Sequence, residues 1–154
     1  MELTISGLKK RGDWESVGIK LPGYDVEAAA KAAKKNPRWV HFGIGNIFRI
    51  FLGGIADTLL EEGEMDAGIT CVESFDYDVV DKIYDPYDNL ALSVILNGDG
   101  TQEKKVLGSL AEALKAQSSD AAAWQRLKEI FSAESLQMVS FTITEKGYAL
   151  KKAD

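Results

Sequence analysis

The sequence has 154 residues, of which 45% are hydrophobic and 27% charged, as in soluble globular proteins. Its formal net charge is −6 without a basic stripe, which argues against nucleic acid as the main partner. No run approaches the roughly 18 apolar residues of a membrane span, and the N-terminus lacks an apolar signal core, so we expect neither membrane insertion nor secretion. The single cysteine, Cys71, excludes an internal disulfide and fits a reducing, cytoplasmic location.

The N-terminal part is predicted to be an extension that carries one helix. Residues 1–24 are rich in turn formers, and we expect an extended leader lying over the domain. Asp25 can cap a helix through Lys35, because VEAAAKAAKK has high helix propensity and Asn36-Pro37 stops it. The chain therefore divides into an extension over residues 1–37 and a domain over residues 38–154.

Strands and helices alternate in the first half of this domain. Arg38 to Phe42 is a short apolar strand, and a helix of nearly all-round apolar character is predicted from about Asn46 to Glu62. The run AGITCVES is continuously apolar and rich in β-favouring residues, which predicts a strand covered on both faces. A short helix is expected in YDVVDKIYD, ending before Pro86.

The second half begins with a predicted β-hairpin, because period-2 segments flank Asn97-Gly98-Asp99-Gly100. Ser109 to Glu112 reads as a capping box for a short helix through about Lys115. Asp120 can cap a further helix through Phe131, and LQMVSFTIT is a strand. Three side chains of that helix are predicted to lie in the core: Trp124, Leu127 and Phe131. The order indicates an α/β domain with a mainly parallel sheet and an inserted β-hairpin.

The stretch VHFGIGNIFRIF resembles the strand, glycine turn and helix that bind dinucleotide phosphates. Gly43 allows the turn off the strand, and Gly45 allows backbone to approach a pyrophosphate. The third position of GxGxxG is Phe48, so a purely structural turn stays an alternative. Asn46 can cap the helix or bind a phosphate, and Arg49 can reach a phosphate or a substrate carboxylate. The predicted contacts in this stretch are Gly43, Ile44, Gly45, Asn46 and Arg49.

An acid follows at the end of the next strand. Glu73 lies 28 residues after Gly45, whereas a Rossmann site usually places an acid for the ribose hydroxyls about 20 residues on. The long first helix and the EEGEMDAG loop account for the extra length. A carboxylate there repels a 2′-phosphate and favours NAD over NADP. Glu73 can instead begin a solvated loop, with Asp76 or Asp78 in its role.

Four segments together resemble the N-terminal domain of the mannitol dehydrogenase family: HFGIGNIFR, DYDVVDKIYDPYDNLALSVILNGDG, GSLAEAL and SLQMVSFTITEKGY. This family of long-chain polyol-specific dehydrogenases includes reductases of fructuronate and tagaturonate. The resemblance covers Trp39 to Leu150. It implies that residues 38–154 are a Rossmann-like NAD-binding domain, in which GxGNxxR replaces GxGxxG. Relatives often have His-Arg-Ala-His where this chain has Phe48-Arg49-Ile50-Phe51.

The resemblance also implies an activity in carbohydrate metabolism: NAD-dependent hydride transfer between a secondary alcohol and its ketone, of the mannonate/fructuronate or mannitol/fructose type. In the family the catalytic lysine, with nearby asparagine and histidine, lies in a helical C-terminal domain that this chain lacks. We therefore expect no catalytic residue here and no activity from the chain alone. His41, the only histidine, is expected to be a packed strand residue. The alternative is a non-enzymatic nucleotide-sensing or protein-interaction module.

Three polar residues follow the last predicted strand. Thr142 and Thr144 share a face at its carboxyl end, where open α/β sheets bind ligands, and both can touch the nicotinamide half of NAD. Lys146 can face a sugar or polyol substrate, although a solvated turn residue before Gly147 is the simpler interpretation.

Overall fold

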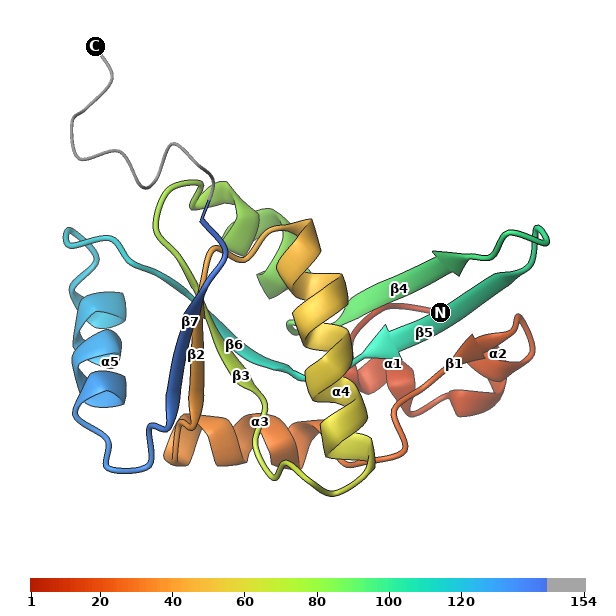
Figure 1. Ribbon diagram of the computed structural model, residues 1–154, viewed down its shortest axis with the longest axis horizontal. Helices are drawn as coiled ribbons and strands as arrows, with labels where there is room; N and C mark the ends of the chain where they lie inside the picture. The colour runs from red at the N-terminus through yellow and green to blue at the C-terminus, as the bar shows by residue number, and fades with distance from the viewer. Residues whose placement is uncertain (144–154) are drawn as a thin grey trace, which may run out of the picture.

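A computed structural model describes residues 1–143 of the chain (Figure 1). Its centre is a four-stranded parallel sheet in the order β6-β3-β2-β7. The strands are β2 (Trp39–Phe42), β3 (Ile69–Glu73), β6 (Leu110–Lys115) and β7 (Met138–Phe141). Numbered by their place along the chain within this sheet, they run 3-2-1-4, the order of a nucleotide-binding Rossmann half. The predicted Rossmann-like α/β fold is confirmed.

Helices cover both faces of this sheet (Figure 1). On one face lies a continuous helical segment made of a π-helical stretch, η1 (Phe48–Leu52), and α4 (Gly53–Glu61). On the other face lies α5 (Ala121–Phe131). Alternate strand residues point to opposite faces, so each helix packs on its own apolar cluster. Strand β3 between them is buried along its whole length.

Local capping signals predicted two helices correctly. The carboxylate of Asp25 accepts a hydrogen bond from Ala28 N at 2.9 Å and begins α3 (Val26–Lys35). The carboxylate of Asp120 accepts one from Ala123 N at 3.0 Å and begins α5. The two lysines at the end of α3 suit the negative end of the helix dipole. These contacts lie within a few residues, so the sequence displays them directly.

The predicted core face of α5 is partly wrong. Leu127 is buried, but Trp124 and Phe131 are 42% and 51% exposed. Ile130 is fully buried in place of them and packs with Val40 and Val72 of the sheet. The inward stripe is therefore centred between Leu127 and Ile130, and the two aromatic residues lie on its flank.

The capping-box prediction at Ser109 to Glu112 is wrong, because this segment enters strand β6. Leu110 and Ala111 are buried, and the strand pairs in parallel with β3. Ser109 Oγ donates to Gly53 O at 2.7 Å instead of capping a helix. Glu112 is buried and accepts from Arg126 Nη2 at 2.8 Å. Long-range pairing thus overrides the local helix signal.

The second sheet contains the predicted hairpin. Strands β4 (Ala91–Leu96) and β5 (Gln102–Leu107) pair in antiparallel fashion, and β1 (Ile19–Lys20) adds to β5 in parallel. The helical segment before it is η2 (Val80–Tyr84), a π-helical stretch, followed by a 3₁₀ turn, η3 (Asp85–Tyr87). The helix expected before Pro86 therefore ends at Tyr84, and Pro86 lies inside the following turn.

The first 24 residues are folded, so the expectation of an extended leader is wrong. They contain α1 (Ile5–Leu8), α2 (Arg11–Glu15) and β1. Trp14 is buried and packs in a cluster with Leu21 and Val106. Trp14 Nε1 donates to Gly7 O at 3.0 Å, which satisfies the indole donor. Within residues 1–143, none of the helices combines the length and apolar character needed to cross a bilayer.

A buried carboxylate ties the N-terminal segment to the parallel sheet's helix. Asp57 of α4 is fully buried and lies 2.7 Å from Lys105 Nζ of β5. It also accepts hydrogen bonds from the Tyr24 hydroxyl and from Gly108 N, the latter at 2.9 Å. Burial next to this carboxylate raises the pKa of the Tyr24 phenol. The buried charge is thus compensated by the Lys105 ammonium and by two hydrogen bonds to the other carboxylate oxygen.

Candidate functional site

The candidate site is the turn between β2 and η1, at the carboxyl edge of the parallel sheet. From β2 the chain continues to β3 on one side of it, whereas β7, reached from β6, lies on the other side of β2. The turn after β2 therefore lies at the topological switch point of the sheet. Open α/β sheets bind their ligands at this place. The motif predicted from the sequence is therefore located where the fold places a ligand.

The two glycines of the turn face different surroundings. Gly43 has φ +89°, and a Cβ on it would lie 2.3 Å from Thr142 O, so no other residue fits there without a shift. Gly45 does not have a positive φ, and a Cβ on it would meet nothing within 4 Å. Packing of the described residues therefore explains Gly43, whereas Gly45 borders open space.

Gly43 is held by both neighbouring strands. Its N–H donates to Val72 O of β3 at 3.0 Å. Its carbonyl accepts from the Thr142 hydroxyl, and Thr142 N donates to Phe42 O at 2.9 Å. The glycine backbone thus joins the ends of β3 and β7, and it has no unpaired polar group.

Ile44 is held by two side chains from other elements. Its N–H donates to Glu73 Oε2 at 3.3 Å, and its carbonyl accepts from the Tyr84 hydroxyl at 2.8 Å. Its side chain is fully buried in the core cluster below η1. The predicted contact of Ile44 with a cofactor stays a prediction, and its backbone groups are already paired within the protein.

The helix that leaves the turn presents free donors. Its first hydrogen bond runs from Arg49 N to Gly45 O at 3.0 Å, so the N–H groups of Asn46 and Ile47 have no acceptor within the helix. Asn46 and Gly45 are exposed. Arg49 donates to Asn46 Oδ1, and its guanidinium lies 5.9 Å from the centre of the Tyr84 ring. Free N–H groups beside a guanidinium suit an anionic group such as a phosphate.

Glu73 lies where the sequence predicted, at the end of β3 and next to the glycine turn. It is 8% exposed, and its Oε1 accepts from the N–H groups of Ser74, Phe75 and Asp76 at 3.0, 2.9 and 3.3 Å. These bonds, with the one from Ile44, orient the carboxylate toward the backbone of its own loop. The role of Glu73 at the ribose stays a prediction, as does the alternative role of Asp76 or Asp78.

Thr142 is exposed at the end of β7, beside the switch point. Its position agrees with the predicted place, and its contact with nicotinamide stays a prediction. Thr144 and Lys146 lie outside the described residues. His41, expected to be a packed residue, is fully buried in β2 and stacks on Phe48, with ring centres 4.0 Å apart and planes 7° apart.

Two residues of the site, Tyr84 and Ser140, were not predicted from the sequence. Tyr84 is 40 residues from the carbonyl that it binds, and burial raises the pKa of its phenol, which keeps it a donor. Ser140 bonds both Trp39 and His41 across the sheet. In SFTIT, Ser140 and Thr142 alternate with apolar residues, and this is the one local signal that one face of the strand is polar.

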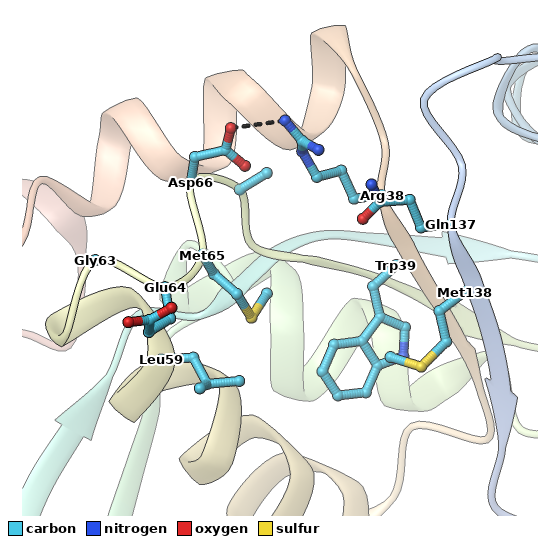
Figure 2. Close-up of a pocket in the computed structure, with 10 residues that line it drawn as sticks. Arg38, Trp39, Leu59, Gly63, Glu64, Met65, Asp66, Gln137 and Met138 are labelled. Carbon is cyan, nitrogen blue, oxygen red and sulfur yellow. Dashed lines mark hydrogen bonds and ion pairs between the residues drawn. The ribbon is translucent and has the colours of Figure 1, made fainter.

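A separate cavity of about 440 Å³ lies at the other end of β2 and β7 (Figure 2). Trp39 and Met138 lie on one side of it, and Met65 and Leu59 on the other, beside the ion pair of Arg38 and Asp66. It adjoins the amino ends of these strands. The carboxyl ends, where such sheets bind nucleotides, carry the glycine turn instead.

Two curated proteins are similar to the chain in sequence. A D-mannonate oxidoreductase of Thermotoga maritima is 48% identical over 151 residues, which are 98% of this chain and 28% of that protein. A mannitol 2-dehydrogenase of Pyrenophora tritici-repentis is 30% identical over 116 residues, covering 73% of this chain and 19% of that protein. The chain thus spans less than a third of the length of these relatives. No protein-family model matches it.

Two solved structures share the fold. The Pseudomonas fluorescens mannitol 2-dehydrogenase, in a ternary complex with NAD and D-mannitol, superposes with a TM-score of 0.75 and 28% identity over 96% of this chain and 28% of its own. A substrate-free D-sorbitol dehydrogenase gives a TM-score of 0.68 and 27% identity over 88% of this chain and 26% of its own. The resemblance to the mannitol dehydrogenase family is confirmed.

Proposed function

We propose that this chain, similar over nearly its whole length to proteins of the mannitol dehydrogenase family, is the NAD-binding part of an oxidoreductase. The enzyme would interconvert the secondary alcohol of a polyol or sugar acid and its ketone by hydride transfer. The observation that carries the proposal is the glycine turn from Gly43 to Gly45 at the switch point of a 3-2-1-4 parallel sheet. A D-mannonate oxidoreductase as a relative favours a mannonate/fructuronate substrate pair over a mannitol/fructose pair.

In this proposal each part of NAD is bound by different residues in and beside the turn. The free N–H groups after Gly45, with Arg49 beside them, would take the pyrophosphate. Glu73, or an acid of the loop after it, would take the adenosine ribose. Thr142, together with Thr144, would border the nicotinamide half, because β7 lies on the other side of the switch point. NAD itself supplies the hydride acceptor when it is bound.

The proton of the alcohol needs a base that is positioned near the reacting carbon. His41 is buried, with both ring nitrogens hydrogen-bonded, so it cannot serve. We assign the base and most substrate contacts to a helical C-terminal domain of the full-length protein, which would pack against this one. Division into an extension (1–37) and an NAD-binding domain (38–154), and a cytoplasmic location, belong to the same proposal.

A matched pair of glycine substitutions tests the proposal. Gly45→Ala adds a methyl group in the open space where a phosphate would approach, and Gly54→Ala adds one on α4, also with nothing within 4 Å. NADH is titrated by energy transfer from the three tryptophans. We expect saturable binding, weakened about tenfold or more by Gly45→Ala, as for loss of about 1.4 kcal/mol, and unchanged by Gly54→Ala.

Two results would contradict the proposal. The first is equal binding by Gly45→Ala and the unsubstituted chain. The second is an equal loss in both variants while both stay folded, because the loss would then not depend on the open space at Gly45. Circular dichroism of both variants shows whether they stay folded. We expect it to be unchanged, because beyond the adjacent residues and the helix's own backbone neither methyl group has an atom within 4 Å.

A further inference from the structure

Four polar side chains form a hydrogen-bonded row on one face of β2 and β7, below the helix that leaves the glycine turn. Trp39 and His41 come from β2, and Ser140 and Thr142 from β7 and the residue after it. Trp39 Nε1 lies 2.7 Å from Ser140 Oγ, which lies 2.7 Å from His41 Nδ1. His41 Nε2 lies 3.1 Å from Thr142 Oγ1, whose hydroxyl reaches Gly43 O.

The two ends of the row fix the direction of every hydrogen bond in it. An indole N–H can only donate, so Ser140 Oγ accepts from Trp39. A carbonyl can only accept, so the Thr142 hydroxyl hydrogen goes to Gly43 O. Thr142 Oγ1 must then accept from His41, which places a hydrogen on His41 Nε2. With a neutral ring, His41 Nδ1 accepts the remaining hydrogen, that of the Ser140 hydroxyl.

The surroundings keep this ring neutral and in place. His41 is fully buried, and burial lowers its pKa to about 4. Its plane stacks on Phe48, the first residue of η1. The imidazole therefore contacts the helix through its face, and through Nε2 it contacts Thr142, which in turn binds Gly43 O.

We propose that His41 is a positioning residue for the cofactor turn: its Nε2–H, acting through Thr142, holds the carbonyl of Gly43 and so orients Gly45 and the helix N-terminus. This inference rests on the proposed function and assigns a task to the only histidine of the chain. It also refines the role of Thr142. Its hydroxyl hydrogen is engaged by Gly43 O, so Thr142 acts on the turn and has no hydroxyl hydrogen left to donate to a ligand.

Three substitutions of His41 distinguish the role of Nε2 from the role of Nδ1. Gln places an amide near the position of Nε2 and can donate to Thr142, whereas Asn reaches only the position of Nδ1 and contacts Ser140. Phe keeps the stacking on Phe48 but loses both bonds. Relative to the unsubstituted chain, we expect the NADH dissociation constant to rise about tenfold in His41→Asn and His41→Phe, and about threefold or less in His41→Gln, from the worth of one hydrogen bond.

A merely structural histidine would give another pattern, in which binding is reduced equally in His41→Gln and His41→Asn, following stability alone. That result would overturn the inference. Thermal unfolding of all three variants provides the comparison, because each loses the buried imidazole.

Long-range ¹H–¹⁵N correlation spectra of the unsubstituted chain test the same inference without NADH. We expect the neutral Nε2–H tautomer at pH 7, and amide shifts of Gly43 and Gly45 that stay near their original values in His41→Gln and move in His41→Asn. The Nδ1–H tautomer, or equal shifts in both variants, would overturn the inference. If the tautomer is as expected and NADH does not bind, the proposed function is wrong. The inference that His41, through Thr142, holds the Gly43 carbonyl is then still supported.

Discussion

The two faces of the β2–β7 pair differ in kind although the same four-residue strands build both. On the face below α5, Val40 packs with Leu127 and Ile130, and Phe42 stacks on Phe141 with ring centres 5.2 Å apart. On the face below η1, the alternate residues are Trp39 and His41 and their partners on β7, joined by hydrogen bonds. Both faces are covered by a helix, but only the face below η1 carries a hydrogen-bonded row that reaches the glycine turn.

The comparison shows where polar groups can be buried in a sheet. An apolar face is stabilised by the area it removes from water, in proportion to its size. A buried polar row costs free energy unless every donor has an acceptor. The row on this face meets that condition, and it ends at the carbonyl of Gly43. We therefore expect substitutions on the α5 face to change stability, and substitutions in the row to change stability and the turn together.

The largest effect is expected on the apolar face. Ile130→Ala removes a fully buried side chain between the sheet and α5. By analogy with other buried aliphatic residues, the free energy of unfolding should fall by about 3 kcal/mol, within a usual range of about 2–5. Urea unfolding measures it. A fall below about 1 kcal/mol would show that α5 does not pack as described.

The next largest effect concerns the polar face, where His41 should make the free energy of unfolding depend on pH. An unfolded histidine titrates near pH 6.5, and burial lowers the pKa of His41 to about 4. As pH falls below 6.5, the unfolded chain binds a proton that the folded chain does not. Stability from this group is therefore full above about pH 7 and declines until about pH 4, by about 2 kcal/mol between pH 7.5 and 5.

This pH dependence is measured by urea unfolding at both pH values, in the unsubstituted chain and in His41→Gln, which cannot titrate. The groups facing His41 are Cys71 on β3, whose thiol pKa is raised by burial, and Ser140, Thr142 and Phe48. None of them is charged at neutral pH. Equal pH dependence in both proteins would contradict the assignment to His41.

A smaller effect is expected from Ser140→Ala. It removes the hydroxyl that accepts from Trp39 Nε1 and donates to His41 Nδ1, and it leaves two ring nitrogens without these partners. We expect the free energy of unfolding to fall by about 1–2 kcal/mol. Thermal unfolding measures the loss, and restoration by Ser140→Thr, which keeps a hydroxyl, is the control. A Ser140→Ala variant as stable as the unsubstituted chain would show that water replaces the hydroxyl.

The smallest effect is expected at Trp124, which the sequence predicted to be core. Because it is 42% exposed, Trp124→Gln should change the free energy of unfolding by about 0.5 kcal/mol or less. The same urea series that measures Ile130→Ala measures it. A loss comparable to that of Ile130→Ala would restore the original prediction for the inward face of α5.

What the sequence could predict depended on distance along the chain. The Asp25 and Asp120 caps lie within three residues of the amides that they bind, and both were predicted. Gly43, Gly45 and Glu73 were placed correctly relative to the strands, because strand ends and glycine turns have local patterns. Strand β6 was not, because its pairing with β3 joins residues about 40 positions apart and outweighs a local capping signal.

The internal bonds of the site were beyond sequence reasoning for the same reason. Tyr84 binds Ile44 across 40 positions of the chain, and Ser140 binds His41 across 99 positions. A tyrosine or a serine in a sequence does not indicate such a distant partner. The register of β7 beside β2 decides that Ser140 lies opposite His41. A one-residue slip would place Phe141 there and remove the polar row.

The most direct test of the central claim, that the turn after β2 holds the cofactor, is a ¹H–¹⁵N NMR titration of the chain with NADH. We predict the largest saturable amide shifts at Gly45, Asn46 and Ile47, with smaller ones at Glu73 and Thr142. Shifts centred instead on Trp39 and Met138 at the opposite cavity, or no shifts at millimolar NADH, would contradict it.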